Sequence, residues 1–347
     1  MTFPKRALAL LSGGLDSLLA AKLIQEQGVD VEGINFFTGF CVQGHTQAIR
    51  QNNKTSPKRN GALFSAHQLG IKCHIVDVVE PYKSVVLNPK FGYGSVMNPC
   101  LDCKVFMVSR AMQFAQENGF DFIISGEVIG QRPKSQLKKY APIVSKQSGA
   151  QDLLVRPLCA QFMPETKPER LGWIDRSLLL GITGRSRKQQ IALAEKYGFE
   201  EYAQPAGGCC FLTDPNYKRK LTDLWSQKQE RDYELDDILL LKVGRHIRPR
   251  PHFKLIVGRE VGENRYLMGY RKQFTHFIPS SCQGAMTIVD GVLTSEEDMI
   301  LAAQIAARFT QGRHAAEVTF DMTTPEGSQP ITVTPLPESE IPQEWYL

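Results

Sequence analysis

The chain has 347 residues, of which 42% are hydrophobic and 22% charged, and its net charge is +5. This composition is typical of a folded chain with apolar residues enough for two domains, and it excludes disordered and collagen-like proteins. No stretch approaches the roughly 20 apolar residues of a membrane span, and the N-terminus does not read as a signal peptide, so we expect a cytoplasmic protein with no membrane partner.

Apolar runs and helical spacings alternate in the first part of the chain. Strands are expected at 7–11, 31–37, 73–79 and 120–125, and helices after residue 15 and at 62–69 and 104–118. This alternation predicts an α/β fold with a doubly wound parallel sheet. Ligands of such sheets bind at the carboxyl ends of the strands, so the segments after the first, second and fourth strands should share one cleft.

Shorter elements follow in the second half. Helices are expected at 186–197, 215–231 and 296–309, and short strands at 253–257, 266–270, 286–289, 318–320 and 331–333. The strands and the last of these helices, all after residue 232, predict a smaller α+β domain. We divide the chain into a first domain over 1–232, the α+β domain over 233–325 and a C-terminal tail over 326–347. The last dozen residues of this tail, with Pro335, Pro337 and Pro342, are expected to be loose.

The segment Ser12-Gly13-Gly14-Leu15-Asp16-Ser17 joins the first strand to the first helix. Glycine permits a tight turn, and the unpaired N–H groups and dipole of a helix N-terminus attract anions. We therefore predict a phosphate-binding loop, with an ordinary strand–turn–helix connection as the alternative. The Walker P-loop is excluded because no lysine follows the second glycine.

Eight cysteines suggest reactive or metal-binding thiols rather than disulfides in a reducing compartment. Cys100 and Cys103 form a Cys-Leu-Asp-Cys pair at a helix start, where the dipole is expected to lower the thiol pKa, and Cys209 and Cys210 lie in a glycine-rich turn. The other four cysteines are expected to be packing residues: Cys41, Cys73, Cys159 and Cys282.

Three uses of these thiols compete. A structural zinc site needs four ligands, which two adjacent cysteines serve poorly. A catalytic pair would use one cysteine to carry sulfur and a second to resolve it. An iron–sulfur cluster held by three cysteines would leave one iron open, and the chemistry favours the last two uses equally.

Four motifs carry a family resemblance. The glycine loop resembles the pyrophosphate-binding loop of the N-type ATP pyrophosphatases, the PP-loop superfamily. Together with AsnProCysLeuAspCysLys (98–104), AspPheIleIleSerGly (121–126) and GlyGlyCysCysPheLeu (207–212), it resembles the tRNA-specific 2-thiouridylases. The stretch 125–136 departs from that family and is similar instead to the tRNA 4-thiouridine sulfurtransferases. The resemblance covers residues 5–225.

The resemblance implies an enzyme that adenylates a uridine carbonyl oxygen of tRNA with ATP and replaces that oxygen with sulfur from a persulfide carrier or sulfide. The implied ATP-binding residues are Ser12, Gly13, Gly14, Asp16, Ser17, Gly126 and Gln131, with Asp16 also placing Mg²⁺ as a catalytic residue. The implied sulfur-handling residues are catalytic Cys103 and Cys210, or Cys100, Cys103 and Cys210 as ligands of a [4Fe-4S] cluster.

The C-terminal part is basic, because residues 236–275 contain nine Lys or Arg and four acidic residues. From 236 to 320 it resembles the RNA-binding domain of NFACT-type proteins, and a basic, strand-rich module suits phosphate contacts. A solvated basic surface is the alternative. The candidate RNA contacts are Arg245, Arg248, Arg250, Lys254 and Arg259.

Two other functions remain open from the sequence. A PP-loop ATP pyrophosphatase could act on a small molecule, with the basic region incidental. A non-catalytic RNA-binding protein could retain the loop as a relic, although the intact loop and the placed cysteines oppose that hypothesis.

Overall fold

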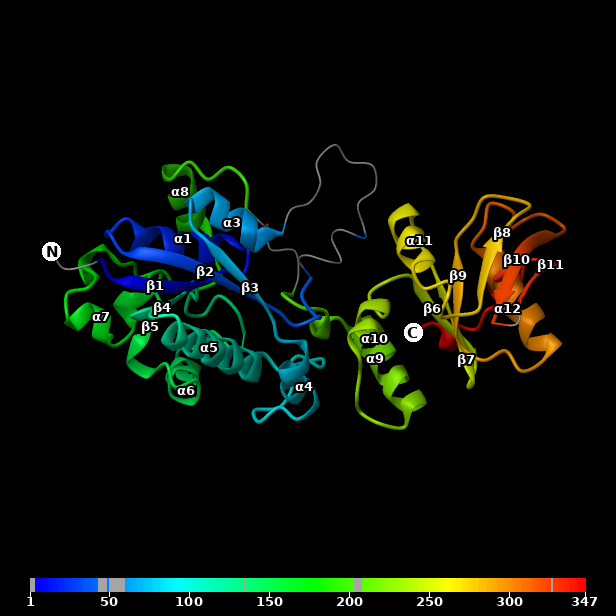
Figure 1. Cartoon of the computed structure of the whole chain (residues 1–347), viewed down its shortest axis with the longest axis horizontal. Coiled ribbons are helices and arrows are strands. Elements are labelled where there is room, and N and C mark those ends of the chain that lie inside the picture. Colours follow the sequence, from blue (N-terminus) through cyan, green and yellow to red (C-terminus); the bar gives the residue numbers. More distant parts are fainter. Residues whose placement is uncertain (1–3, 43–48, 50–59, 134, 203–207, 326) are drawn as a thin grey trace. The chain divides into compact units, whose positions relative to one another are not determined.

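A computed structural model describes residues 4–42, 49, 60–133, 135–202, 208–325 and 327–347 (Figure 1). The described residues form two compact units: residues 4–42 and 60–213 belong to the first, and Ile49 belongs with the residues from Asp214 onward to the second. No helix within the described ranges is long and apolar enough to cross a membrane.

The first unit contains a five-stranded parallel sheet with the strand order β3-β2-β1-β4-β5. Its elements are β1 (Arg6–Leu10), α1 (Leu15–Gln25), β2 (Asp30–Phe37), α3 (Gly61–Leu69), β3 (Cys73–Asp77), α4 (Val79–Leu87), α5 (Cys100–Glu117), β4 (Phe122–Ser125), α6 (Ala141–Gln147), β5 (Leu154–Val155), α7 (Lys167–Arg170) and α8 (Lys188–Lys196). The predicted α/β fold with a doubly wound parallel sheet is confirmed.

Helices cover both faces of this sheet because its strands are apolar on both faces. Ala7 and Ala9 of β1 pack with α1, α3 and α8, whereas Leu8 packs with α5 on the opposite face. Figure 1 shows α1, α3 and α8 on one side of the strands and α5 and α6 on the other. The alternation of side chains along a strand therefore divides the core into two layers.

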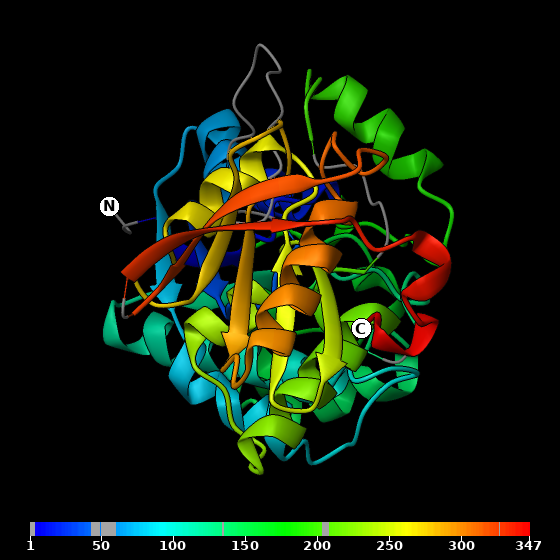
Figure 2. The same ribbon diagram turned by 90° about the vertical axis from the view of Figure 1, so that its right-hand side faces the viewer.

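The second unit contains a six-stranded antiparallel sheet with the order β11-β10-β8-β9-β7-β6. Its elements are α9 (Pro215–Lys228), α10 (Leu235–Leu240), β6 (Arg245–Arg250), β7 (Phe253–Val257), α11 (Val261–Met268), β8 (His276–Pro279), β9 (Thr287–Gly291), α12 (Glu296–Arg308), β10 (Val318–Thr324) and β11 (Gly327–Val333). Helix α12 covers one face of the sheet (Figure 2). The predicted smaller α+β domain is confirmed.

The strand predicted at 266–270 is wrong, because most of this segment lies in helix α11. Its alternating aromatic and apolar residues resemble a strand, but Glu263 and Leu267, four residues apart, are both buried on one helix face. The Glu263 carboxylate accepts the Arg259 N–H at 2.9 Å and holds the chain at the helix start.

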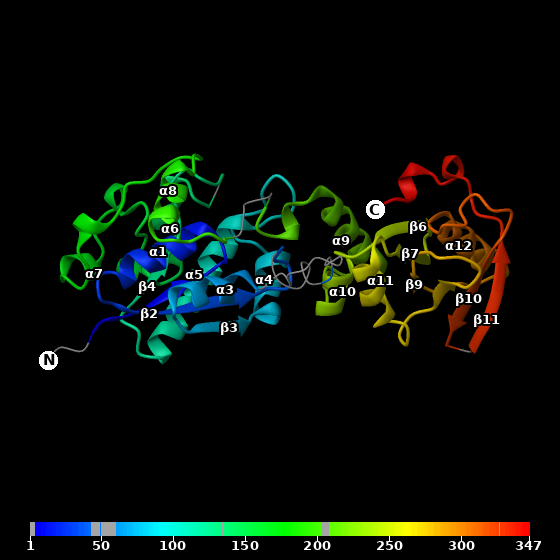
Figure 3. The same cartoon turned by 90° about the horizontal axis from the view of Figure 1, so that it is seen from above.

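The segment predicted as a loose tail is also ordered by contacts. The strand expected at 331–333 is part of β11, which pairs with β10 along its whole length (Figure 3). In the segment expected to be loose, Ile341 is buried and the Leu347 N–H donates to the His246 carbonyl at 3.1 Å. The ordering comes from long-range pairing with strands β10 and β6, which local proline content does not reveal.

The domain boundary at residue 232 stays a prediction. In the structure, the boundary between the compact units falls between Thr213 and Asp214. Helix α9 belongs to the second unit because its polar side chains bond there. The Tyr217 hydroxyl donates to the Ile238 carbonyl at 2.9 Å, and the Lys220 ammonium donates to the Leu241 carbonyl at 3.2 Å.

Candidate active site and nucleic-acid interface

The glycine loop connects β1 to α1 and leaves the helix start open. Gly13 has a φ of 78°, a conformation that disfavours residues with a side chain. The Ser17 hydroxyl accepts the Ser12 N–H at 3.2 Å and donates to the Gly14 carbonyl at 2.9 Å, which fixes the turn. No side chain among the described residues caps α1, so its first N–H groups have no side-chain acceptor there and suit an anion.

The end of β4 approaches this loop closely. A β-carbon at Gly126 would lie 2.5 Å from the Ser17 backbone nitrogen and 2.6 Å from the Asp16 carbonyl. Only glycine permits this approach, since backbone atoms cannot move aside as a flexible side chain can. Gly126 therefore lies beside the loop, as predicted from the motif, and the open helix start and close approach fit a bound phosphate chain.

We expect Gly126→Ala to weaken ATP binding at least tenfold and to lower the free energy of unfolding by about 1–3 kcal/mol, because the new methyl group displaces the loop backbone. Titration calorimetry with a non-hydrolysable ATP analogue measures the affinity. Gly28→Ala is the control: its φ of 80° makes alanine destabilising, yet no atom outside its neighbours lies within 4 Å. Wild-type affinity in Gly126→Ala would contradict the assignment.

The Asp16 carboxylate is held from two directions in the first turn of α1. Gln131 donates to its Oδ2 at 2.7 Å, and the Arg187 guanidinium lies 3.8 Å from its Oδ1, which is buried without a hydrogen bond. Gln190 in turn donates to the Gln131 side-chain oxygen at 3.1 Å. An oriented carboxylate oxygen with unused acceptor capacity suits Mg²⁺.

The structure thus brings Gln131 to Asp16, in agreement with its expected place in the site. Arg187 and Gln190 were not among the predicted site residues. They lie at the start of α8, far along the chain from the glycine loop, and no local motif marks them.

Five thiols gather in the first unit near the hydroxyl group of Tyr82. We call them the thiol cluster: Cys41, Cys100, Cys103, Cys209 and Cys210. Cys41 and Cys210 form an antiparallel bridge, and the Cys103 thiol interacts electrostatically with its neighbours in the cluster. Cys41, which was expected to be a packing residue, is therefore part of the candidate site.

Cys103 and Cys209 have different environments. Burial raises the pKa of Cys103 to about 12, although the Tyr82 hydroxyl donates a hydrogen bond to its sulfur. This is opposite to the lowering expected for a helix start, because burial outweighs the helix dipole. A hydrogen bond from the Cys210 thiol, with the cations Arg132 and Lys104, lowers the pKa of exposed Cys209 to about 6.

A metal cluster does not fit the thiol cluster as the structure places it. No three Cys, His, Asp or Glu side chains in the described part of the chain are arranged to hold a metal ion. The Cys100 sulfur instead accepts a hydrogen bond from the Asn98 amide at 2.9 Å. We therefore derive no step through an iron–sulfur cluster.

A buried ion-pair network lies beside the cluster at the end of β4. The Glu127 carboxylate contacts the Arg156 guanidinium at 2.7 Å and the Lys104 ammonium at 3.3 Å, and these cations lower its pKa against the effect of burial. Lys104 also donates to the Ser125 hydroxyl at 3.3 Å. The network fixes the lysine that follows Cys103 and places its charge near Cys209.

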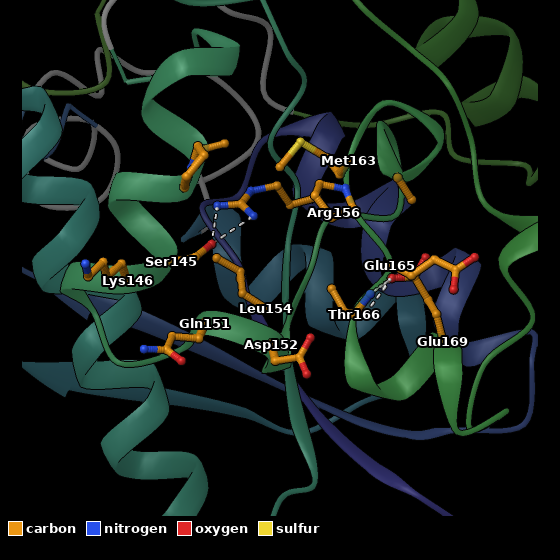
Figure 4. A pocket seen from close by; sticks show the side chains of 14 residues that line it. Ser145, Lys146, Gln151, Asp152, Leu154, Arg156, Met163, Glu165, Thr166 and Glu169 are labelled. Carbon is orange, nitrogen blue, oxygen red and sulfur yellow. Dashed lines mark hydrogen bonds between the residues drawn. The ribbon is translucent and has the colours of Figure 1, made fainter.

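Arg156 also lines a cavity of about 430 Å³ between α6 and α7 (Figure 4). Its guanidinium contacts the Ser145 hydroxyl at 3.4 Å, and the Thr166 N–H donates to Glu169 at 2.7 Å. None of the residues lining this cavity belongs to the glycine loop or to the thiol cluster. The cavity is therefore separate from the candidate chemistry.

The structure divides the five candidate RNA contacts into two groups. Arg245 and Arg250, at the ends of β6, are exposed. Lys254 is only 1% exposed and lies 3.1 Å from both Asp223 and Asp290.

The other two candidates are also committed to ion pairs. Arg248 forms an ion pair with Asp223, and Arg259 contacts Glu263 at 3.0 Å. Alternation along β7 explains the burial of Lys254, because Phe253 and Leu255 take the opposite face of the sheet. Intramolecular ion pairs therefore occupy three of the five cations, and Arg245 and Arg250 remain for an external anion.

Comparison with known proteins agrees with the two units. A model of the tRNA methyl transferase HUP domain matches residues 5–147, and a model of the NFACT protein RNA binding domain matches residues 244–346. Both resemblances are confirmed. Each model covers less than half of the chain.

Curated relatives match over more than half of the chain. A tRNA-specific 2-thiouridylase from Pelobacter propionicus is 26% identical over 76% of this chain and 65% of its own length. A tRNA-specific 2-thiouridylase from Thermotoga petrophila is 27% identical over 76% of this chain and 68% of its own length. For several such relatives the chain spans less than two thirds of their length.

A solved structure, a 4-thiouridine synthetase–RNA complex with bound ATP, is 18% identical. The match covers 69% of this chain and 52% of that chain, with a TM-score of 0.41.

Proposed function

We propose that the protein is an ATP-dependent tRNA sulfurtransferase that forms AMP and pyrophosphate. One observation carries this proposal: the end of β4 contacts both the glycine loop and Lys104, the residue that follows Cys103. Gly126 packs against the glycine loop, while the neighbouring Ser125 and Glu127 bind Lys104, which follows Cys103. An ATP loop and a thiol cluster that share one strand end can act on the same carbonyl carbon.

Each half has a defined chemical task. The N–H groups at the start of α1 would bind the phosphates of ATP, and Asp16 would hold Mg²⁺, which neutralises phosphate charge. A uridine oxygen attacks the α-phosphate and pyrophosphate leaves, so that the oxygen becomes part of a good leaving group, AMP. Sulfur carried on Cys210 then displaces AMP from the base carbon.

The paired thiols Cys209 and Cys210 suit the loading of sulfur. The hydrogen bond between the two thiols lowers the pKa of Cys209 and raises that of Cys210, so Cys210 holds the proton of the pair. When Cys210 attacks a persulfide donor, this proton passes to the leaving thiolate of the donor. Adenylation and sulfur attack both require that the uridine leave its base stack.

The experiment combines the purified protein, an unmodified tRNA transcript, ATP with Mg²⁺ and a persulfide-generating cysteine desulfurase. Thiouridine measured by nucleoside mass spectrometry should form only when ATP is present, with pyrophosphate released in equal amount. If ATP–pyrophosphate exchange proceeds without RNA and no thiouridine forms, the proposal fails in favour of a small-molecule substrate. If neither reaction occurs, the hypothesis of a non-catalytic RNA-binding protein replaces it.

In the second unit, we propose that Arg245 and Arg250 contact RNA phosphates. Arg250→Ala should weaken RNA binding and reduce the dependence of log affinity on log salt concentration by about 1, the value of one phosphate contact. Fluorescence anisotropy over a salt series measures this slope.

Lys254→Met is the matched control for Arg250→Ala. It should leave the salt slope unchanged and lower the free energy of unfolding by about 3 kcal/mol, because the buried ion pairs with Asp223 and Asp290 are broken. A reduced slope in Lys254→Met, or an unchanged slope in Arg250→Ala, would contradict this division of the cations.

A further inference from the structure

Cys41 lies directly opposite Cys210 in a short antiparallel pairing of residues 40–42 with residues 209–211. The Val42 N–H donates to the Cys209 carbonyl at 3.3 Å, and the Phe211 N–H donates to the Phe40 carbonyl at 2.9 Å. These two hydrogen bonds flank the bridge between Cys41 and Cys210. The two cysteines therefore occupy a non-hydrogen-bonded pair, the antiparallel position in which side chains come closest.

This register suits a disulfide. Opposite residues in a non-hydrogen-bonded pair have Cα atoms about 4.5 Å apart. Disulfides span Cα separations of about 4.4–6.8 Å. Both thiols are free in the structure and both are partly accessible.

The other candidate partner, Cys103, is placed differently. It lies in the first turn of α5, where its N–H donates to the Pro99 carbonyl at 2.8 Å, and it has no backbone pairing with Cys210 among the described residues. Its sulfur accepts a hydrogen bond from the buried hydroxyl group of Tyr82. Backbone pairing thus aligns Cys41 with Cys210, whereas side-chain contacts engage Cys103.

We propose that Cys41 is the catalytic thiol that resolves the sulfur carried on Cys210, an inference that rests on the proposed sulfur-transfer function. After the terminal sulfur of the Cys210 persulfide has displaced AMP, the base is joined to Cys210 through two sulfur atoms. The Cys41 thiol loses its proton to solvent and attacks the Cys210 sulfur. A Cys41–Cys210 disulfide forms, and the bond to the transferred sulfur breaks.

The electrons balance in this step. The Cys41 sulfur is oxidised from thiolate to disulfide, and the transferred sulfur is reduced and leaves as the thiolated base. A dithiol reductant of the thioredoxin class then returns Cys41 and Cys210 to thiols. Without RNA, the same attack on a Cys210 persulfide releases hydrosulfide and forms the same disulfide.

The test loads the full-length protein with inorganic polysulfide, blocks free thiols with iodoacetamide and maps non-reduced tryptic peptides by mass spectrometry. The three relevant cysteine sites fall in separate tryptic peptides, 23–50 with Cys41, 91–104 with Cys100 and Cys103, and 197–218 with Cys209 and Cys210. We expect a link between 23–50 and 197–218 together with hydrosulfide release.

Variants identify the sulfur atoms of that link. It should persist in Cys103→Ser, in Cys209→Ser and in the control Cys282→Ser, and should disappear in Cys41→Ser and Cys210→Ser. A link between 91–104 and 197–218 with Cys41 alkylated, or a persulfide that remains without any link, would overturn the proposal.

The RNA arm separates this inference from the proposed function. With tRNA, ATP and persulfide donor, Cys41→Ser should accumulate RNA attached to the protein and released by dithiothreitol. Thiouridine formation by the wild type without the Cys41–Cys210 link overturns the resolving role alone. If the Cys41–Cys210 link forms but no thiouridine appears, even in the presence of ATP and reductant, the sulfurtransferase function is overturned. The disulfide between Cys41 and Cys210 then stands without that function.

Discussion

Replacing Cys210 by serine should reduce thiouridine formation on the order of 1000-fold while tRNA-dependent pyrophosphate release continues. A serine hydroxyl is close in size to the thiol but cannot carry a sulfane sulfur, so activation of the base proceeds and the transfer stops. The measurement compares nucleoside mass spectrometry with a pyrophosphate assay on the same reactions. Because the glycine loop and Asp16 are unchanged, ATP affinity should equal that of the wild type.

Two further cysteine variants control for this result. Cys282→Ser changes a thiol of the second unit, outside the thiol cluster, and should keep both activities. Cys100→Ser should keep most of the sulfur transfer, because Cys100 accepts a hydrogen bond from Asn98 and a persulfide mechanism does not use its sulfur. If Cys210→Ser lost pyrophosphate release as well, Cys210 would be needed for the structure of the site rather than for sulfur transfer.

Asp16→Asn should reduce ATP–pyrophosphate exchange about 100-fold or more, and thiouridine formation with it. The substitution keeps the shape of the side chain and an acceptor for Gln131, but it removes the charge that would hold Mg²⁺ and that faces Arg187. The readouts are exchange of labelled pyrophosphate and the Mg²⁺ concentration needed for half-maximal exchange.

Asp102→Asn is the matched control because Asp102 also lies in the first turn of a helix, α5. Its carboxylate accepts the Lys90 N–H at 2.7 Å and the Phe91 N–H at 3.1 Å, contacts that an amide oxygen can preserve in part. Exchange in this variant should remain close to the wild-type value. Wild-type exchange in Asp16→Asn would show that Asp16 neither holds the metal ion nor orients the phosphates.

The two variants together separate activation from transfer. Loss of Asp16 should stop the reaction before pyrophosphate leaves, and loss of Cys210 should stop it afterwards. A protein that acts on a small molecule without sulfur chemistry would respond to Asp16→Asn alone.

Local sequence determined the main elements of the first unit. The apolar run of β1, the glycines and the helical spacing of α1 lie within about 20 residues of one another. The glycines set the turn by their backbone conformation, and the apolar residues of the strand and helix set those elements by their burial. Strand alternation with helices was sufficient to predict the parallel sheet. The segment after β4 was expected to share a cleft with the glycine loop, and the structure places Gly126 against that loop.

Tertiary structure alone decided which distant side chains meet. Arg187 lies beside Asp16, and Cys41 pairs with Cys210. Lys254, which was expected to contact RNA, is instead a buried ion-pair partner of Asp223. Each depends on the order of strands and on a register between segments far apart in the chain. A one-residue change of register would place Cys41 opposite another residue, so no pattern within either segment encodes the pair.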